Sequence, residues 1–295
     1  MMQLFAVKQL AAGANEPHIQ ETASKLNVFV KNLALQNISD ITQGKVEKWI
    51  ADERIAAYRA PRTINSYVIA LKSFCNYLVE TGRFLKSPLI SIKKLNENIG
   101  RRKQRRAFTA EELQKIYKVA RKNQTKKKPA KEDDRELIYR LLAGTGLRST
   151  ELGLAVPSQF DFERNLFTVD ASKTKNKKAD ILPVRADLMK RLKKYIAARD
   201  IKPTERIFYY SAYSLLSALK RDLASAGIEQ KSADGRSLDV HSFRRTFGTM
   251  LARAGVPLTT TQRLMRHSSP ELTAKLYIDV EPLDMQNAVE KLTEI

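Results

Sequence analysis

Residues 241–277 read HSFRRTFGTMLARAGVPLTTTQRLMRHSSPELTAKLY and hold a dense set of reactive side chains. His241 and Arg244 are three positions apart, which predicts that they share one face of a helix. His267 and Tyr277 follow within the same stretch. This combination of cations and a phenol predicts a site that grips a phosphodiester and attacks it.

A further arginine, Arg148, lies upstream in the sequence GTGLRSTEL, where glycines allow a backbone and a ligand to approach closely. A phosphodiester repels nucleophiles, and its transition state carries still more negative charge. An arginine fork matches two phosphate oxygens and stays charged, so Arg148 and Arg244 are suited to hold one phosphate. Tyr277 would then be the nucleophile and form a phosphotyrosine. Each residue alone is more often structural, but together on a basic chain they indicate catalysis.

The composition favours a polyanionic partner. The 295 residues include 53 Lys and Arg against 32 Asp and Glu, which gives a net charge of +21. Such a field attracts nucleic acid above all. An anionic membrane is the competing partner, but we find no lipidation signal, no basic amphipathic helix with an exposed apolar face and no apolar run of about eighteen residues. We therefore expect a cytoplasmic, nucleoid-associated protein that binds DNA and no membrane.

Cysteine and histidine are scarce. The single cysteine, Cys75, excludes an internal disulfide framework, and its apolar surroundings predict a buried side chain. Three histidines leave little material for a metal site, so we expect no metal and no cofactor. The N-terminus has no long apolar core and does not resemble a secretory signal.

Hydrophobic periodicity predicts a mainly α fold with a small antiparallel β-hairpin. Residues 1–97 read as a compact helical domain, with helices near 17–35, after a cap at Thr42, and from Pro61 to Gly82. Residues 108–295 read as a second domain, in which Thr109 and Glu112 form a capping box. Its strands are predicted at 165–172 and 179–184, and its later helices at 186–199, 212–226, 241–254, 258–266, 270–278 and 282–293.

A basic segment joins the two predicted domains. Residues 98–107 are nearly all polar or cationic, which is typical of an exposed linker. The linker is either a DNA-backbone contact or a solvated tether, and its sequence fits both. Its candidate phosphate contacts are Arg101, Arg102, Lys103, Arg105 and Arg106.

The motifs TGLRSTEL, HSFRRTFGTMLARAG and RHSSPELTAKLYID, taken together, resemble those of tyrosine site-specific recombinases, the family of phage integrases and Xer-type recombinases. The resemblance covers most of residues 107–280, and TINSYVIALKSFCNYLVETG more weakly resembles the family's core-binding domain. It implies a helical core-binding domain and a mixed α/β catalytic domain. Tyr277 lies ten residues after His267, whereas nine is common in the family.

The resemblance also implies a role for each site residue. Arg148 and Arg244 would hold the scissile phosphate, and His241 and His267 would donate hydrogen bonds or move protons. Tyr277 would attack, become linked to the 3′ phosphate and free a 5′ hydroxyl, without metal or ATP.

Further side chains would support this reaction. In the hairpin, Lys173 is the first choice for the acid that protonates the leaving oxygen and Lys175 the second, while Lys177 and Lys178 contact the DNA backbone or solvent. Glu151 would orient Arg148, or else is a helix N-terminal charge. Outside the motif stand three weaker candidates for the nucleophile: Tyr209, Tyr210 and Tyr213.

By analogy with the family, the partners are double-stranded DNA with specific recombination sites and accessory DNA-bending proteins. Four protomers would assemble on two sites and pass through a Holliday junction. The tail, residues 282–295, would dock on a neighbouring protomer or fold back on its own domain. Two alternatives to recombination are a type IB topoisomerase-like enzyme that relaxes DNA and a non-catalytic DNA-binding protein.

Overall fold

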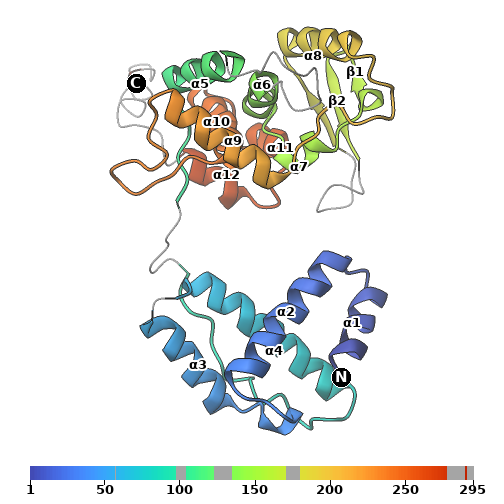
Figure 1. The fold of residues 1–295 in the computed structure, drawn as a ribbon, viewed down its shortest axis with the longest axis vertical. Coiled ribbons are helices and arrows are strands. Elements are labelled where there is room, and N and C mark those ends of the chain that lie inside the picture. Colours follow the sequence, from blue (N-terminus) through green and yellow to red (C-terminus); the bar gives the residue numbers. More distant parts are fainter. Residues whose placement is uncertain (57, 98–103, 123–134, 171–179, 278–289, 291–295) are drawn as a thin grey trace, which may run out of the picture. The chain divides into compact units, whose positions relative to one another are not determined.

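A computed structural model describes residues 1–56, 58–97, 104–122, 135–170, 180–277 and 290, with the Tyr277 side chain excluded. The chain divides into two compact units, Met1–Arg102 and Lys103–Ile295, here called the N-terminal and the C-terminal unit (Figure 1). The division falls within residues 98–107, the range that the sequence predicts to be a linker. No helix in the described ranges is long and apolar enough to cross a bilayer.

The N-terminal unit is helical. Two of its starts follow capping rules: the Thr42 hydroxyl accepts a hydrogen bond from the Lys45 backbone N–H, and Pro61 occupies the first turn of its helix. The first helix was not expected from the sequence, because its apolar residues extend around it instead of forming one stripe. The elements are α1 (Met2–Ala11), α2 (Glu16–Asn32), η1 (Ile38–Asp40), α3 (Gln43–Ile55) and α4 (Pro61–Glu80).

Aromatic side chains fill the core of this unit. The rings of Phe29 in α2 and Trp49 in α3 lie 4.6 Å apart and are both buried. Cys75 in α4 is also buried, as the sequence predicts, and burial raises the pKa of its thiol to about 12. The core therefore closes α2, α3 and α4 into one body.

The C-terminal unit holds eight helices and one small sheet among its described residues. The capping box predicted at its start is present: Glu112 accepts from the Thr109 backbone N–H at 2.9 Å, and Thr109 Oγ1 accepts from Glu112 N–H at 3.1 Å. The helices are α5 (Ala110–Lys122), α6 (Arg135–Thr145), α7 (Ser149–Gly153), α8 (Ala186–Ala198), α9 (Ala212–Ser225), α10 (Val240–Arg253), α11 (Leu258–Met265) and α12 (Pro270–Tyr277), with the short turn η2 (Pro157–Gln159).

The sheet is antiparallel, in the order β1 (Phe160–Asp161), β2 (Leu166–Val169) and β3 (Asp180–Pro183). Phe167 of β2 lies opposite Leu182 of β3, and both are buried in the same hydrophobic core as Leu188 of α8, which lies beside the sheet (Figure 1). β2 and β3 confirm the predicted hairpin. β1 has only two residues, too few for a period-two pattern to predict it.

Candidate active site

Arg148 stands at the start of α7, immediately after the glycine-flanked turn. Glu151 of the same helix accepts hydrogen bonds from the Arg148 backbone N–H at 2.8 Å and from its Nη1 at 2.9 Å. Arg148 is thus the N-cap residue of α7. The Arg148 side chain keeps 39% of its surface exposed, so its guanidinium is available to a ligand.

Glu151 is buried and also contacts Arg266, a residue that the sequence did not single out. Arg266 Nη1 and Nη2 donate to the two carboxylate oxygens of Glu151 at 3.2 and 2.6 Å. Burial alone raises the pKa of Glu151, but hydrogen bonds from Arg266 and Arg148 outweigh burial and hold that pKa below its ordinary value. One ionised carboxylate therefore orients two guanidinium groups, and it does more than charge a helix end.

Arg244, in the second turn of α10, is only 2% exposed. Its Nη1 donates to the carbonyl oxygen of Gly146, and its Nη2 donates to that of Met265. These contacts join the turn before Arg148 to the turn before His267. Arg244 forms no carboxylate ion pair within the described ranges. Burial and the nearby Arg148 and Arg266 cations lower its pKa to about 9, so it stays charged at neutral pH and its remaining N–H groups can receive an anion.

Two histidines lie near these arginines. His241 is exposed, yet partial desolvation of its ring among neighbouring atoms, followed by the Arg105 and Arg244 cations, lowers its pKa to about 4. Burial, followed by the Arg244 and Arg148 cations, lowers the pKa of His267 to about 4 as well. Both imidazoles are therefore neutral at pH 7. His267 Nδ1 lies 2.9 Å from Thr273 Oγ1, and this bond orients the ring.

The same electrostatic influences show that four of the predicted site residues come together: Arg148, Arg244, His241 and His267. Gly146 permits the turn that brings them together, because its φ is +64° and a Cβ there would lie 2.4 Å from the Phe247 ring. The glycine is thus required for close packing of Phe247, whereas the sequence suggested close approach of a ligand.

Helix α12, which ends at the predicted nucleophile Tyr277, packs against α10 and α11. Gly248 of α10 lets α12 approach, since a Cβ at Gly248 would lie 2.3 Å from Leu276 Cδ1. Leu276 and Thr273 of α12 are buried. Tyr277 is the last residue of α12, and its side chain lies outside the described part of the structure. The end of α12 is therefore held against the helix that carries Arg244.

Several predicted site residues lie outside the described residues: Lys173, Lys175, Lys177, Lys178, Arg101, Arg102, Lys103 and the tail 282–295 except Glu290. Tyr210, one of the weaker candidates for the nucleophile, is engaged elsewhere, because its hydroxyl donates to the Ser149 carbonyl oxygen at 2.6 Å. Burial raises the pKa of that phenol. Tyr213 is 81% exposed on α9, and Tyr209 contacts Glu205.

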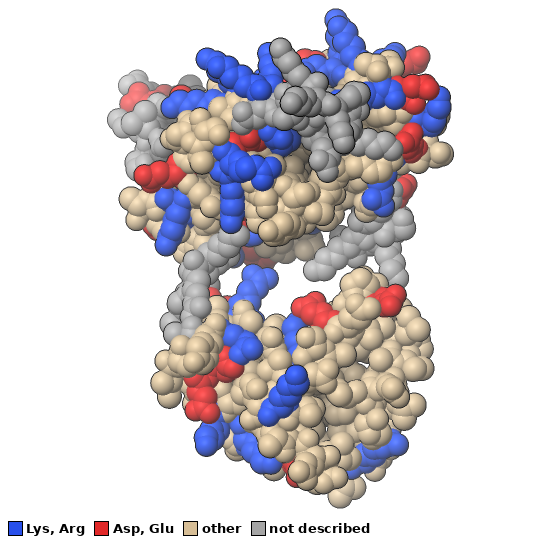
Figure 2. All heavy atoms as spheres, viewed as in Figure 1, with Lys and Arg blue, Asp and Glu red and all other residues tan. Residues whose placement is uncertain are grey.

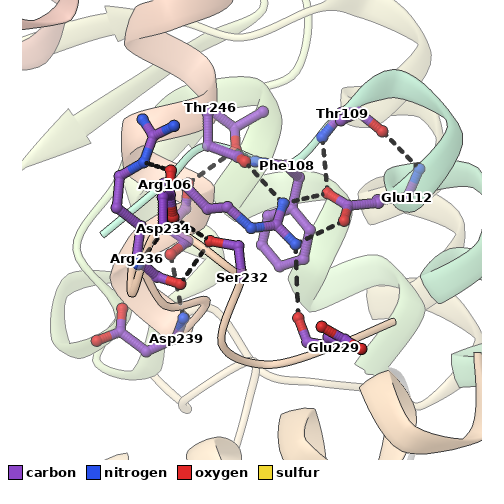
Figure 3. A network of polar contacts seen from close by, with 12 residues as sticks. Arg106, Phe108, Thr109, Glu112, Glu229, Ser232, Asp234, Arg236, Asp239 and Thr246 are labelled. Carbon is purple, nitrogen blue, oxygen red and sulfur yellow. Dashed lines mark hydrogen bonds and ion pairs between the residues drawn. The ribbon is translucent and has the colours of Figure 1, made fainter. Parts of the chain in front are cut away.

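The structure describes two arginines of the predicted linker, and both form ion pairs within the protein. Arg106 donates two hydrogen bonds, at 2.6 and 2.7 Å, to the Glu112 carboxylate (Figure 3), and only 16% of its side chain is exposed. Arg105 Nε donates to Asp239 at 2.7 Å. Residues 98–107 alone do not reveal these contacts, because both carboxylates lie outside that segment.

The chemistry available to this cluster is anion binding. Two guanidinium groups, those of Arg148 and Arg266, share the carboxylate of Glu151, and the third, Arg244, is buried without a carboxylate partner in the described ranges. A buried cation needs a counter-charge, and a phosphate oxygen supplies one with matching geometry. Lys and Arg side chains also spread over the face of both units shown in Figure 2. No group of three or more His, Cys, Asp or Glu side chains in these ranges is arranged to hold a metal.

Sequence comparison finds relatives that match this chain across both of its units. A XerA tyrosine recombinase from Saccharolobus solfataricus is 27% identical over 96% of this chain and 82% of its own length. A XerC-like tyrosine recombinase from Caldanaerobacter subterraneus is 26% identical over 90% of this chain and 75% of its own. Both alignments extend well beyond the active-site motifs.

Solved structures share the fold at low sequence identity. A lambda integrase dimer bound to a COC′ core site has a TM-score of 0.73 and 15% identity, covering 100% of this chain and 97% of that one. The XerH site-specific recombinase bound to a palindromic difH substrate has a TM-score of 0.68 and 20% identity, covering 95% and 81%. The profile of the phage integrase family matches residues 106–283. The chain therefore belongs to the phage integrase family, whose members include the Xer-type tyrosine recombinases.

Proposed function

We propose that this protein is a site-specific DNA recombinase that cleaves and rejoins strands through a 3′-phosphotyrosine intermediate. The observation that supports this function is the buried Arg244, which has no carboxylate partner among the described residues, beside the partly exposed Arg148. Two such cations bind one phosphate and stabilise the charge that develops in its transition state. Relatives that are tyrosine recombinases over most of this chain support the same reaction.

In the proposed reaction the Tyr277 oxygen attacks the scissile phosphorus and loses its proton. The bond between the phosphorus and the 5′ oxygen of the next nucleotide breaks. That oxygen receives a proton, from Lys173 in our assignment or from Lys175. Neutral His241 and His267 donate hydrogen bonds to the phosphate or carry the tyrosine proton. The phosphotyrosine conserves the bond energy, so a 5′ hydroxyl can attack it and rejoin a strand without ATP.

The proposed partner is double-stranded DNA that carries specific recombination sites. The solved relatives named above are bound to a core site and to a difH substrate. We infer that residues 1–97 bind the core site beside residues 108–295, and that four protomers exchange strands through a Holliday junction, with or without DNA-bending proteins. Phosphate contacts should dominate the affinity and make it depend steeply on salt.

A nicked suicide duplex tests the proposal. Wild type should form a denaturation-resistant protein–DNA adduct, whereas Tyr277→Phe should bind the duplex and form none. Tyr213→Phe, which alters an exposed tyrosine of α9, should form the adduct as wild type does. An adduct that survives Tyr277→Phe would assign the nucleophile elsewhere. Binding without any adduct would favour a non-catalytic protein, and relaxation of supercoiled DNA without paired sites would favour a topoisomerase.

A further inference from the structure

The segment that enters the C-terminal unit lies along the residues that precede α10. Arg105 and Ser237 form a parallel β-bridge. Ser237 N–H donates to the Gln104 carbonyl oxygen at 2.8 Å, and Arg106 N–H donates to the Ser237 carbonyl oxygen at 3.3 Å. The backbone of Arg105 is therefore held on both sides, and the direction of its side chain is set by the fold.

The Arg105 side chain reaches the cap of the helix that carries His241. Its Nε donates to Asp239 Oδ2 at 2.7 Å, while Asp239 Oδ1 accepts the His241 backbone N–H at 2.9 Å. Asp239, labelled in Figure 3, is the N-cap of α10, and it is only 6% exposed. One buried carboxylate thus connects Arg105 to the first turn of α10.

We propose that Arg105 is a positioning residue that, through Asp239, fixes the first turn of α10 and aims His241 at the scissile phosphate. This inference rests on the proposed recombinase function. It gives Arg105 a role inside the active site in place of the DNA-backbone contact that its sequence suggests. The Asp239 carboxylate accepts both the bond from Arg105 and the capping bond from the His241 backbone N–H. Loss of Arg105 therefore loosens the cap of α10 even though Asp239 remains.

Charge supports the same arrangement. The charged groups around His241 are Arg105, Arg244, Arg148 and Asp239, and His267 lies near enough to interact with it. After burial, the Arg105 cation is the largest influence that lowers the pKa of His241, whereas Asp239 raises that pKa. Arg105 and Asp239 therefore affect the protonation of His241 in opposite directions, which a merely structural ion pair outside the site would not do.

The first experiment separates positioning from DNA contact. Arg105→Ala and Asp239→Asn are measured by single-turnover cleavage of the nicked suicide duplex and by DNA affinity at several salt concentrations. Asparagine is a good N-cap, so Asp239→Asn removes the charge and keeps the cap hydrogen bond to His241. Arg236→Ala is the matched control, because Arg236 pairs with Asp234 in the turn before α10 and has 39% of its side chain exposed, against 41% for Arg105.

Positioning predicts that Arg105→Ala and Asp239→Asn each slow cleavage about tenfold, and that the double variant is no slower than either, since both act through one contact. DNA affinity and its salt dependence stay at the wild-type values, as they do in Arg236→Ala. A phosphate contact predicts instead weaker binding with a salt slope smaller by about 1. That result, or cleavage at the wild-type rate in Arg105→Ala, would overturn the proposal.

A pH profile of the cleavage rate provides the second readout. Arg105→Ala should move the acidic limb to higher pH, because a cation that disfavours the imidazolium is gone. Asp239→Asn should move it to lower pH, because a favourable anion is gone. If the acidic limb does not move in either variant, or moves in the same direction in both, Arg105 and Asp239 do not act on His241. If wild type forms no adduct, the recombinase function itself fails; if wild type reacts and these variants react equally well, only this inference fails.

Discussion

Arg266 adopts a left-handed backbone conformation, with φ of 50°, and there forms a two-bond ion pair with Glu151, which precedes it by 115 residues. Both side chains are buried, with 6% and 4% of their surfaces exposed. A non-glycine residue in this conformation costs about 1 kcal/mol or more. The fold retains arginine at the end of α11 because the buried carboxylate needs a cation.

Removing Arg266 should destabilise the protein and slow cleavage. Arg266→Ala leaves Glu151 with Arg148 as its remaining guanidinium partner, so we expect the free energy of unfolding to fall by about 3 kcal/mol. Arg266→Gly also loses the ion pair, but it accepts the left-handed backbone and should be less destabilised by about 1 kcal/mol. Urea denaturation of the two variants measures both values. Equal stability of Arg266→Ala and wild type would contradict a stabilising pair.

Stability should rise with pH across the histidine range. His241 and His267 have folded-state pKa values of about 4 against ordinary values of 6.5, so between these pH values the unfolded chain binds more protons. The histidine contribution is complete above pH 6.5 and is lost as pH falls towards 4. His267→Gln should flatten this slope in thermal unfolding, whereas His18→Gln, at an exposed position of α2, should not. A slope that persists in full in His267→Gln would rule out His267 as its source.

Arg244→Lys tests the phosphate clamp. Lysine keeps the positive charge but cannot bond both the Gly146 and Met265 carbonyl oxygens and still present a fork to phosphate. We expect cleavage to slow by about a hundredfold or more, with little change in DNA affinity. Arg253→Lys, at the other end of α10, is the control. A loss of affinity that accounts for the whole rate loss would make Arg244 only a binding residue.

Gly248→Ala tests the delivery of Tyr277. The added Cβ would collide with Leu276 and push α12 away from α10, so cleavage should fall about tenfold or more while DNA binding persists. Gly44→Ala is the matched control, because a Cβ at Gly44 in α3 meets no atom within 4 Å and alanine favours the helix by up to about 1 kcal/mol. Cleavage by Gly248→Ala at the wild-type rate would contradict this dependence on close packing.

Replacing the leaving oxygen with sulfur distinguishes the two hairpin lysines. A thiolate leaves without protonation, so the variant that lacks the general acid should be slow on ordinary DNA and fast on a duplex with a 5′-bridging sulfur. We expect this rescue for Lys173→Ala and not for Lys175→Ala. Rescue of the Lys175 variant alone would exchange their roles, and rescue of neither would remove both from proton transfer.

The sequence by itself determined the local elements and the composition of the site. Some features depend on interactions between residues that are close in the sequence, so a local sequence pattern predicts them. They include the capping pair Thr109 and Glu112, the strands β2 and β3, and the helical spacing of His241 and Arg244. The short strand β1 and helix α1 carry too weak a periodicity to be predicted.

Tertiary structure decided how these residues are used. Arg244 bonds a carbonyl oxygen 98 residues away, Arg266 a carboxylate 115 residues away and Arg105 a carboxylate 134 residues away. No spacing rule reports such contacts, because they form only when packing brings the segments together. The physical reason is charge: a cation can be recognised in a sequence, but whether it meets a carboxylate or is left free for phosphate depends on which segment the fold places beside it.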